Sequence, residues 1–149
     1  MPTYAEKRRL PYRADQLFDL VADIERYPEF LPWCRAARVR KREGNVVIAD
    51  VVIGWRVIRE RFTSRDVLQR PDRIDVTYQE GPFKYLNNHW IFEAQADGSC
   101  IVDFYVDFEF HSRFLQKAMS LLFNEAVRRM VHAFEARAQV LYGAGRAKV

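Results

Sequence analysis

The feature that most constrains the fold is a change in hydrophobic period along the chain. Between residues 34 and 110, apolar side chains alternate with polar ones, most clearly from Val102 to Phe110. A period of two is typical of strands in an antiparallel sheet that is covered on one face. From Ser112 to about Tyr142, apolar residues instead recur every three or four positions, which predicts one long helix with Ser112 as its N-cap.

Turn-forming residues divide the alternating region into about six strands. The breaks contain glycine, proline, asparagine or aspartate and lie at 43–45, 54, 71–72, 81–82 and 96–98. A further strand is predicted over 4–10 and a helix over 15–24, with a short turn at 27–31 that two prolines limit. The order strand, short helices, six strands and long helix predicts an α+β domain whose last helix lies across the sheet.

The composition of the 149 residues excludes several classes of protein. With 49% hydrophobic and 30% charged residues, the chain can bury a core, which a disordered chain cannot. Cys34 and Cys100 are the only cysteines, so a disulfide scaffold is excluded and both are predicted to be buried thiols. There is no apolar run of the roughly 18 to 20 residues that cross a bilayer. The first nine residues contain no apolar signal core, which predicts a protein without a signal peptide.

Charge is segregated along the chain. Residues 35–73 hold 11 basic and 5 acidic residues, whereas 74–111 hold 1 and 7. The arginines at alternate positions on two predicted strands are Arg38, Arg40, Arg42, Arg59, Arg61 and Arg65. They predict one outward basic face, which suits an anionic membrane surface or ribosomal RNA, while a solvated face without a partner is the alternative. DNA is not among the expected partners.

The usual motifs of metal, nucleotide and nucleophile chemistry are absent from the sequence. His89, His111 and His132 are scattered, and neither Cys-x-x-Cys nor His-Glu-x-x-His occurs. Gly-x-Gly-x-x-Gly and Gly-Lys-Ser/Thr loops are missing as well. The sequence therefore predicts no metal site, no required cofactor and no catalytic residue.

Glu60 is the polar residue that draws attention. It shares its parity with Phe62 and Ser64, so its side chain is predicted to point inward. An inward carboxylate is costly unless it is paired or protonated. A structural hydrogen bond, a contact that orients a ligand and a catalytic acid all remain open.

Aromatic residues are abundant, with 11 Phe, 7 Tyr and 3 Trp. Strand parity places several of them on the same face of the sheet, and phenylalanine and methionine recur on the facing side of the long helix. These side chains either pack as a solid core or line a cavity for a flexible apolar ligand.

Three segments resemble motifs of the coenzyme Q-binding family, which has a START-like domain. Residues 23–34, DIERYPEFLPWC, resemble the signature D-I/V-E-x-Y-P-x-F-L/V-P-W-C. Residues 53–54 and 59–65, IG and RERFTSR, resemble I-G and R-E-x-F-T-S-R. Residues 81–92 resemble G-P-F-x-x-L-x-x-x-W-x-F. The match runs through about 3–142, so residues 1–149 are interpreted as one domain with a short tail at 143–149.

This resemblance implies a helix-grip fold, in which a curved antiparallel sheet wraps a long C-terminal helix and encloses an apolar cavity. It also implies binding of ubiquinone, or a related isoprenoid quinone or lipid, without chemical turnover, in support of quinone synthesis or delivery to the respiratory chain. The residues that the resemblance and strand parity place at the cavity or its mouth are Phe30, Leu31, Pro32, Trp33, Glu60, Phe62, Tyr78, Phe83, Leu86, Trp90, Phe92, Phe104, Phe108, Met119, Phe123 and Met130.

The resemblance also bears on location and on two other functions. Mitochondrial members begin with a transit peptide, whereas this chain reaches its first predicted strand almost at once, so we expect a bacterial cytoplasmic protein peripheral to the inner membrane. Some bacterial members are ribosome-association toxins, which bind the large ribosomal subunit and block subunit joining. The wider superfamily includes polyketide cyclases, but Glu60 is the only visible candidate for their acid–base chemistry.

Overall fold

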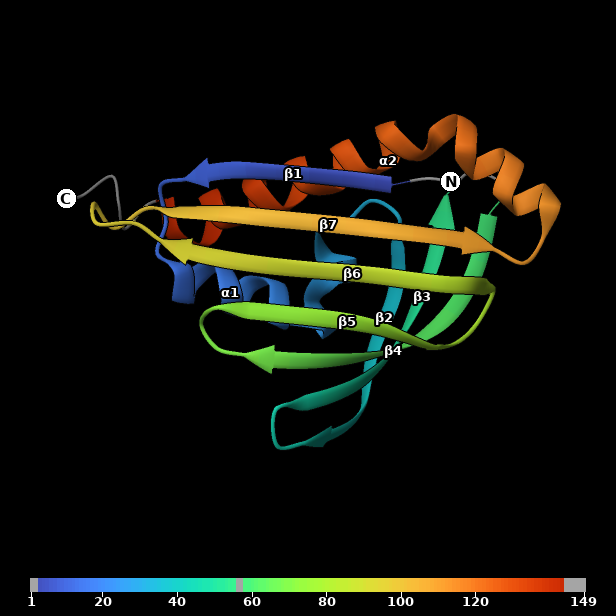
Figure 1. Cartoon of the computed structure of the whole chain (residues 1–149), viewed down its shortest axis with the longest axis horizontal. Coiled ribbons are helices and arrows are strands. Elements are labelled where there is room, and N and C mark those ends of the chain that lie inside the picture. The colour runs from blue at the N-terminus through green and yellow to red at the C-terminus, as the bar shows by residue number, and fades with distance from the viewer. Residues whose placement is uncertain (1–2, 56–57, 144–149) are drawn as a thin grey trace.

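The computed structural model describes residues 3–55 and 58–143. Seven strands form one antiparallel sheet in the order β1-β7-β6-β5-β4-β3-β2, and one long helix lies across its concave face (Figure 1). The strands are β1 (Thr3–Leu10), β2 (Cys34–Glu43), β3 (Val46–Trp55), β4 (Ile58–Gln69), β5 (Arg73–Glu80), β6 (Phe83–Ala94) and β7 (Cys100–Phe110). The helices are α1 (Ala14–Ala22), the 3-10 helix η1 (Ile24–Glu29), α2 (Arg113–Ala138) and the π-helix η2 (Gln139–Gly143). The predicted α+β helix-grip fold is confirmed.

Alternation along the strands decides which face of the sheet is inside. In β7, Val102 and Phe104 are buried on the concave side, whereas Asp103 and Asp107 lie on the other side, opposite the outward residues of β1. The sheet curves strongly because β2, β5 and β6 each carry an extra residue at a register shift, and such bulges bend a strand. The curved sheet therefore has an apolar concave side and a charged convex side.

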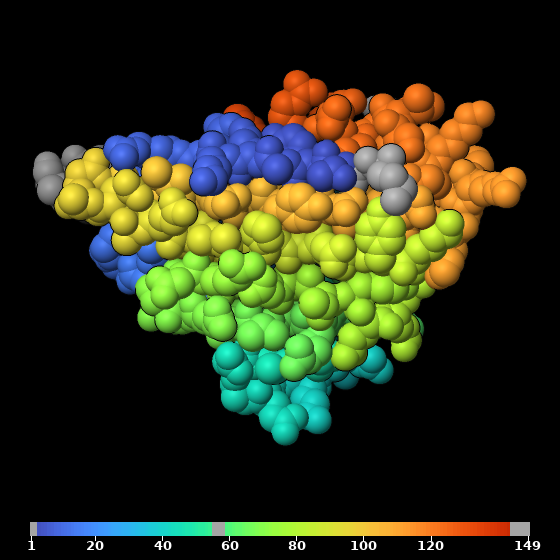
Figure 2. All heavy atoms as spheres, in the orientation of Figure 1, coloured from blue at the N-terminus to red at the C-terminus, as the bar shows by residue number. Residues whose placement is uncertain are grey.

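Helix α2 spans the concave side with its apolar stripe facing inward. The predicted N-cap is confirmed, since the Ser112 hydroxyl accepts a 3.2 Å hydrogen bond from the Leu115 amide. Met119, Phe123 and Phe134 are among its buried residues. At about 1.5 Å per residue, 26 residues span about 39 Å. The start of α2 extends past the ends of the strands (Figures 1 and 2).

The segment between α1 and β2 differs from the prediction. Helix α1 ends at Ala22, and a 3-10 helix over Ile24–Glu29 replaces the short turn expected at 27–31. Pro28 is accommodated inside this helix. The hydroxyl of Tyr27 donates to the Val21 carbonyl, so η1 is held against the end of α1. A periodicity argument does not detect so short a helix.

Candidate ligand-binding site

A cavity of about 200 Å³ lies between the concave face of the sheet and α2. Its lining comes from strands β3 to β7 and from α2, with α1, η1 and the segment before β2 closing one end. The structure brings together most of the predicted lining residues, namely Leu31, Trp33, Phe62, Phe83, Leu86, Trp90, Phe104, Phe108, Met119, Phe123 and Met130. The residues that line it are almost all apolar, so an uncharged apolar ligand fits its chemistry.

Ring contacts fix the sheet side of this cavity. The Phe83 ring stacks on Phe110 at 4.8 Å between centroids and meets Phe62 and Phe108 edge-on at 5.4 and 5.3 Å. Trp90 lies 4.6 Å from Phe104. Such pairs add about 0.5–1.5 kcal/mol each beyond their buried area. The aromatic wall is therefore rigid.

The helix side of the cavity is softer. Met119 and Met130 of α2 face the aromatic wall, with Ala126 between them. Unbranched thioether side chains adapt to irregular shapes, and an alanine leaves room beside them. We therefore expect the cavity to adjust its shape mainly on the α2 side.

The volume of the cavity limits what it holds. A cavity of about 150 Å³ accommodates benzene, and typical sites for drug-sized ligands measure about 300–1,000 Å³. The 200 Å³ observed here suits one substituted six-membered ring. A long polyprenyl chain must extend out of the cavity or displace α2.

Four predicted apolar lining residues lie elsewhere. Pro32 is exposed, and Phe30 packs on Phe134 at 5.2 Å with the Arg137 guanidinium over its ring. Tyr78 accepts a 3.1 Å hydrogen bond from the Phe83 amide and supports that ring from behind the cavity. Phe92 contacts Phe18 of α1 and lines a second, smaller space on the β1 side. None of the four lines the cavity, and Phe30 and Tyr78 instead pack against rings that do.

Glu60 is also outside the cavity lining. It is half-buried, and it pairs with Ile53 near the end of β4. Ile53 and Phe62 line the cavity, so the inward parity of this strand segment is as predicted. The prediction was wrong about which carboxylate enters the cavity: the residue that does so is Asp66, three inward positions further along β4. The alternation that singled out Glu60 continues through Ser64 to Asp66, and extending it would have found this residue.

Asp66 is the buried charge of the cavity. Asp66 is only 5% exposed, and its Oδ1 has no hydrogen-bond partner in the part of the chain that the structure describes. Burial raises the pKa of the Asp66 carboxyl to about 6, although a hydrogen bond from Ser64 acts in the opposite direction. Burial, and secondarily the charge of Asp66, holds the pKa of Tyr27 well above its usual value.

Two uncharged polar residues accompany Asp66 on the same wall. Ser64 lies two residues before it on β4, and Asn88 lies two strands away, because Asp66 pairs with Val76 and Val76 pairs with Asn88. At about 4.8 Å between strands, their backbones are about 10 Å apart. The Asn88 amide donates a 2.8 Å hydrogen bond to the Tyr105 carbonyl, which fixes its orientation. The cavity thus has a polar strip on an otherwise apolar wall.

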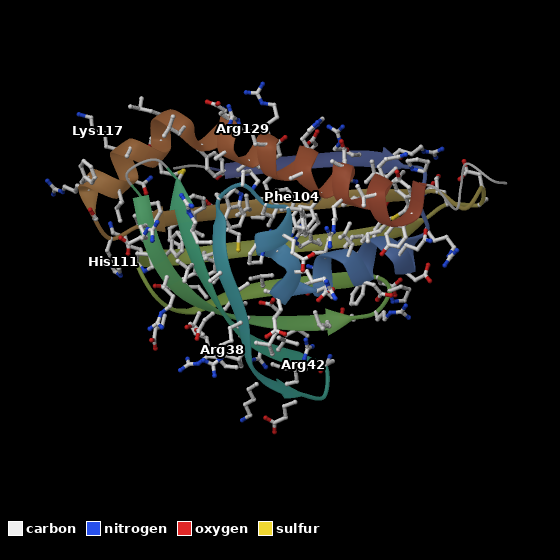
Figure 3. The ribbon with its side chains drawn as sticks, turned by 180° about the vertical axis from the view of Figure 1, so that it is seen from behind. Arg38, Arg42, Phe104, His111, Lys117 and Arg129 are labelled. Carbon is white, nitrogen blue, oxygen red and sulfur yellow. The ribbon has the colours of Figure 1, made fainter. Side chains whose placement is uncertain are left out.

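The convex side of β2, β3 and β4 carries most of the predicted arginines. Among the described residues, the ion pairs leave Arg38, Arg59, Arg61 and Arg65 without a carboxylate partner, and all four are exposed. Arg40 pairs with Asp50 at 3.2 Å. We call the exposed set Arg38, Arg59, Arg61 and Arg65 the basic face; Figure 3 looks onto this side of the molecule.

Arg42 does not belong to that face. A register shift lies between Val39 and Lys41, so Lys41 takes the outward position and Arg42 pairs with Val47, whose side chain is buried. A one-residue slip exchanges the two sides of a strand. The prediction that Arg42 lies on the same outward face as Arg38 is therefore wrong.

Arg35 extends the basic face, and sequence analysis missed it. A Cβ on Gly54 would lie 2.7 Å from the Arg35 Nε, so the arginine side chain lies over the glycine on the convex side. Gly54 pairs with Arg59, which places Arg35 next to the basic face. The glycine of the I-G motif therefore gives room to an arginine on the adjacent strand.

The two cysteines and His89, which the sequence offered as candidates, occupy structural positions. Cys34 and Cys100 are buried free thiols as predicted, and burial raises the pKa of each to about 11. The His89 ring stacks on Tyr105 on the convex side at 5.3 Å. Within residues 3–55 and 58–143, no three histidine, cysteine or acidic side chains gather as a metal site. None of the helices in the described part is both long and apolar enough to span a bilayer.

Known proteins share this sequence over nearly the whole length of this chain. The ribosome association toxin RatA of Pseudomonas aeruginosa is 36% identical over 144 residues, which cover 96% of this chain and 100% of that protein. The mitochondrial coenzyme Q-binding protein COQ10 homolog B of Xenopus laevis is 32% identical over 144 residues, which cover 94% of this chain and 59% of that protein. The solution structure of the 18 kDa protein CC1736 from Caulobacter crescentus is 36% identical and matches with a TM-score of 0.77, covering 96% of this chain and 99% of that one.

Two of these relatives are named as a toxin and as a coenzyme Q-binding protein, and the resemblance found in the motifs is confirmed. Residues 10–135, most of the chain, match the family described as polyketide cyclase/dehydrase and lipid transport. The chain therefore belongs to the polyketide cyclase/dehydrase and lipid transport family.

Proposed function

We propose that the protein binds the ring of ubiquinone, or of a related isoprenoid quinone, in its cavity and carries it without chemical turnover. The observation that carries this proposal is the 200 Å³ cavity, which has a rigid aromatic wall, an adaptable methionine side and one polar strip. A quinone combines a six-membered ring, two polar oxygens and an apolar tail, which match these three features. The name of the coenzyme Q-binding relative is consistent with this ligand.

Exchange of such a ligand requires a membrane, and the outer side of α2 is suited to one. Phe114 and Leu121 are 66% and 80% exposed, and their helical spacing puts them on one face with Lys117 and Arg128. Figure 3 shows Lys117 pointing away from the sheet. Apolar side chains among basic ones favour the interface of an anionic bilayer. We infer that this face of α2 contacts the membrane while the tail of the ligand passes between α2 and the sheet.

The proposal is tested by thermal unfolding with decylubiquinone, a quinone with a short saturated tail. A ligand at a hundred times its Kd stabilises a protein by about 2.7 kcal/mol, so the melting temperature rises. Val76→Phe fills the cavity and should abolish the rise, whereas Val52→Phe, on the convex side of β3, should retain it. A polyprenol without a quinone ring should give a smaller rise. No shift of the wild type with decylubiquinone contradicts the proposal.

A second candidate function is association with the large ribosomal subunit. Two observations favour it: the name of the 36% identical relative and the basic face, whose arginines lack carboxylate partners among the described residues. Arginines on a sheet surface suit the phosphates of ribosomal RNA, and such binding weakens steeply with salt. This function uses the convex side, so it is compatible with a ligand in the cavity.

Co-sedimentation with large subunits tests this second function. Replacing Arg38, Arg59, Arg61 and Arg65 with alanine should abolish co-sedimentation and leave decylubiquinone binding unchanged. Replacing Arg113 and Arg128, exposed arginines of α2, is the matched control and should have little effect. Retention of co-sedimentation by the fourfold variant contradicts a role for the basic face.

A further inference from the structure

Asp66 is a carboxyl group in a cavity whose other described lining residues carry no charge at neutral pH. We propose, on the basis of the quinone-binding function proposed above, that Asp66 selects the redox form of the bound ring: it favours the hydroquinone while it is ionised and the quinone while it is protonated. Neither the motif resemblance nor the known relatives assigns this residue a role.

The Asp66 carboxyl has an unmet hydrogen bond inside the cavity. Asp66 lines the cavity, is 5% exposed, and has an Oδ1 without a partner in the described part of the chain. Ser64 supports the carboxyl from the same strand. A buried polar atom that lacks a partner is costly, and more so when it is charged. A ligand that brings the missing partner into the cavity therefore binds better than one that does not.

The two protonation states of Asp66 complement different hydrogen-bonding groups of the ring. A carboxylate only accepts hydrogen bonds, and the hydroxyls of a hydroquinone donate them. The carbonyls of a quinone only accept, so a quinone oxygen next to an ionised Asp66 leaves both groups unpaired. A protonated Asp66 reverses this situation, because its O–H donates to a quinone carbonyl. Asp66 thus favours the hydroquinone when it is ionised and the quinone when it is protonated.

Asp66 changes its protonation state close to neutral pH. Burial raises the pKa of Asp66 to about 6, and the elements packed around it bring few other ionisable groups. Tyr27 of η1 is the other ionisable residue among the described cavity lining, and its pKa is raised well above the usual value, so it stays neutral. The wall contributes Val76 from β5, Asn88 from β6 and Met130 from α2, which are uncharged. Asp66 is therefore the group in the cavity that changes charge near neutral pH.

The experiment measures the Kd of decylubiquinone and of its hydroquinone for the full chain by quenching of tryptophan fluorescence under anaerobic conditions. At about pH 7.5 we expect the wild type to bind the hydroquinone about tenfold more tightly than the quinone, the effect of one charge-assisted hydrogen bond. At about pH 5 the preference should disappear or reverse. Asp66→Asn should show no pH dependence of the ratio, since an amide both donates and accepts at every pH. Glu60→Gln, on the same strand but outside the cavity, is the matched control and should keep the wild-type behaviour.

The outcomes separate this inference from the proposed function. If the wild type binds both redox forms with a ratio that does not change with pH, the selective role of Asp66 is wrong and quinone binding stands. If the wild type binds neither form at either pH, both are wrong. These two outcomes depend on the wild type alone, so they do not require that any variant folds.

Discussion

The two sides of the sheet carry different kinds of residue. On the concave side, aromatic rings such as Phe83 and Trp90 are buried against α2, and Asp66 is the one carboxylate among the described cavity residues. On the convex side, the arginines of the basic face are exposed, and the acidic residues Asp103 and Asp107 lie on the other end of the sheet. Because successive side chains of a strand point to opposite faces, every strand contributes residues to both sides. The difference teaches that the buried core and the proposed ligand site share the concave side, whereas the proposed ribosome contact uses the convex side.

The largest effect is expected from truncating the aromatic wall. Trp90→Ala removes a residue that is 7% exposed and contacts Phe104 and Phe134 at 4.6 and 5.0 Å. We expect the free energy of unfolding to fall by about 3–5 kcal/mol, measured with urea. His89→Ala changes the adjacent residue on the convex side of β6 and should cost much less. Equal losses in the two variants would contradict the division between the two sides.

The next effect concerns the buried carboxyl and its dependence on pH. The folded-state pKa of Asp66 is about 6, above its value of 3.8 in the unfolded chain, so the folded state binds the proton more tightly. The wild type therefore loses about 3 kcal/mol of stability as the pH rises from below 4 to above 6. Asp66→Asn removes this loss. The difference in unfolding free energy between variant and wild type should grow by that amount over this range, and parallel pH profiles would show that Asp66 titrates normally.

A smaller effect is expected from the convex side. Replacing Arg38, Arg59, Arg61 and Arg65 with alanine removes exposed like charges, and each site should change the unfolding free energy by about 0.5 kcal/mol or less. Because exposed charges repel each other least at high salt, the variant should gain stability relative to the wild type mainly at low salt. Urea unfolding at two salt concentrations measures this. A large loss of stability would show that the basic face is structural.

The smallest effect on stability is expected at the start of α2. Phe114 and Leu121 are largely exposed, so replacing both with serine should leave the unfolding free energy almost unchanged. Binding to anionic vesicles should nevertheless fall by about tenfold or more, since each apolar side chain contributes about 1.5–3 kcal/mol when fully buried. Sedimentation with vesicles measures the loss. Unchanged vesicle binding would remove α2 from the proposed membrane contact.

Much of this architecture follows from periodicity in the sequence. Six strands between 34 and 110, the long helix and the Ser112 cap were all predictable, because alternation and capping act locally. The bulge near Lys41 and the 3-10 helix over Ile24–Glu29 were not, because both depend on tertiary packing and leave no periodic trace.

The candidate site was predictable to a similar extent. Parity found Phe62, Trp90 and Phe104, but it cannot say where along a strand the cavity ends. Glu60 and Phe92 have the inward parity and lie beyond or beside the cavity, whose limits are set by where α1 and α2 cover the sheet.

The central claim is that the cavity holds an isoprenoid quinone, and extraction of the protein tests it most directly. Protein purified without detergent is extracted with organic solvent, and the extract is analysed by mass spectrometry beside that of Val76→Phe. We predict a quinone in near-stoichiometric amount from the wild type and its loss from the cavity-filling variant. Extracts without any quinone from the wild type, or equal amounts from both proteins, would contradict the claim.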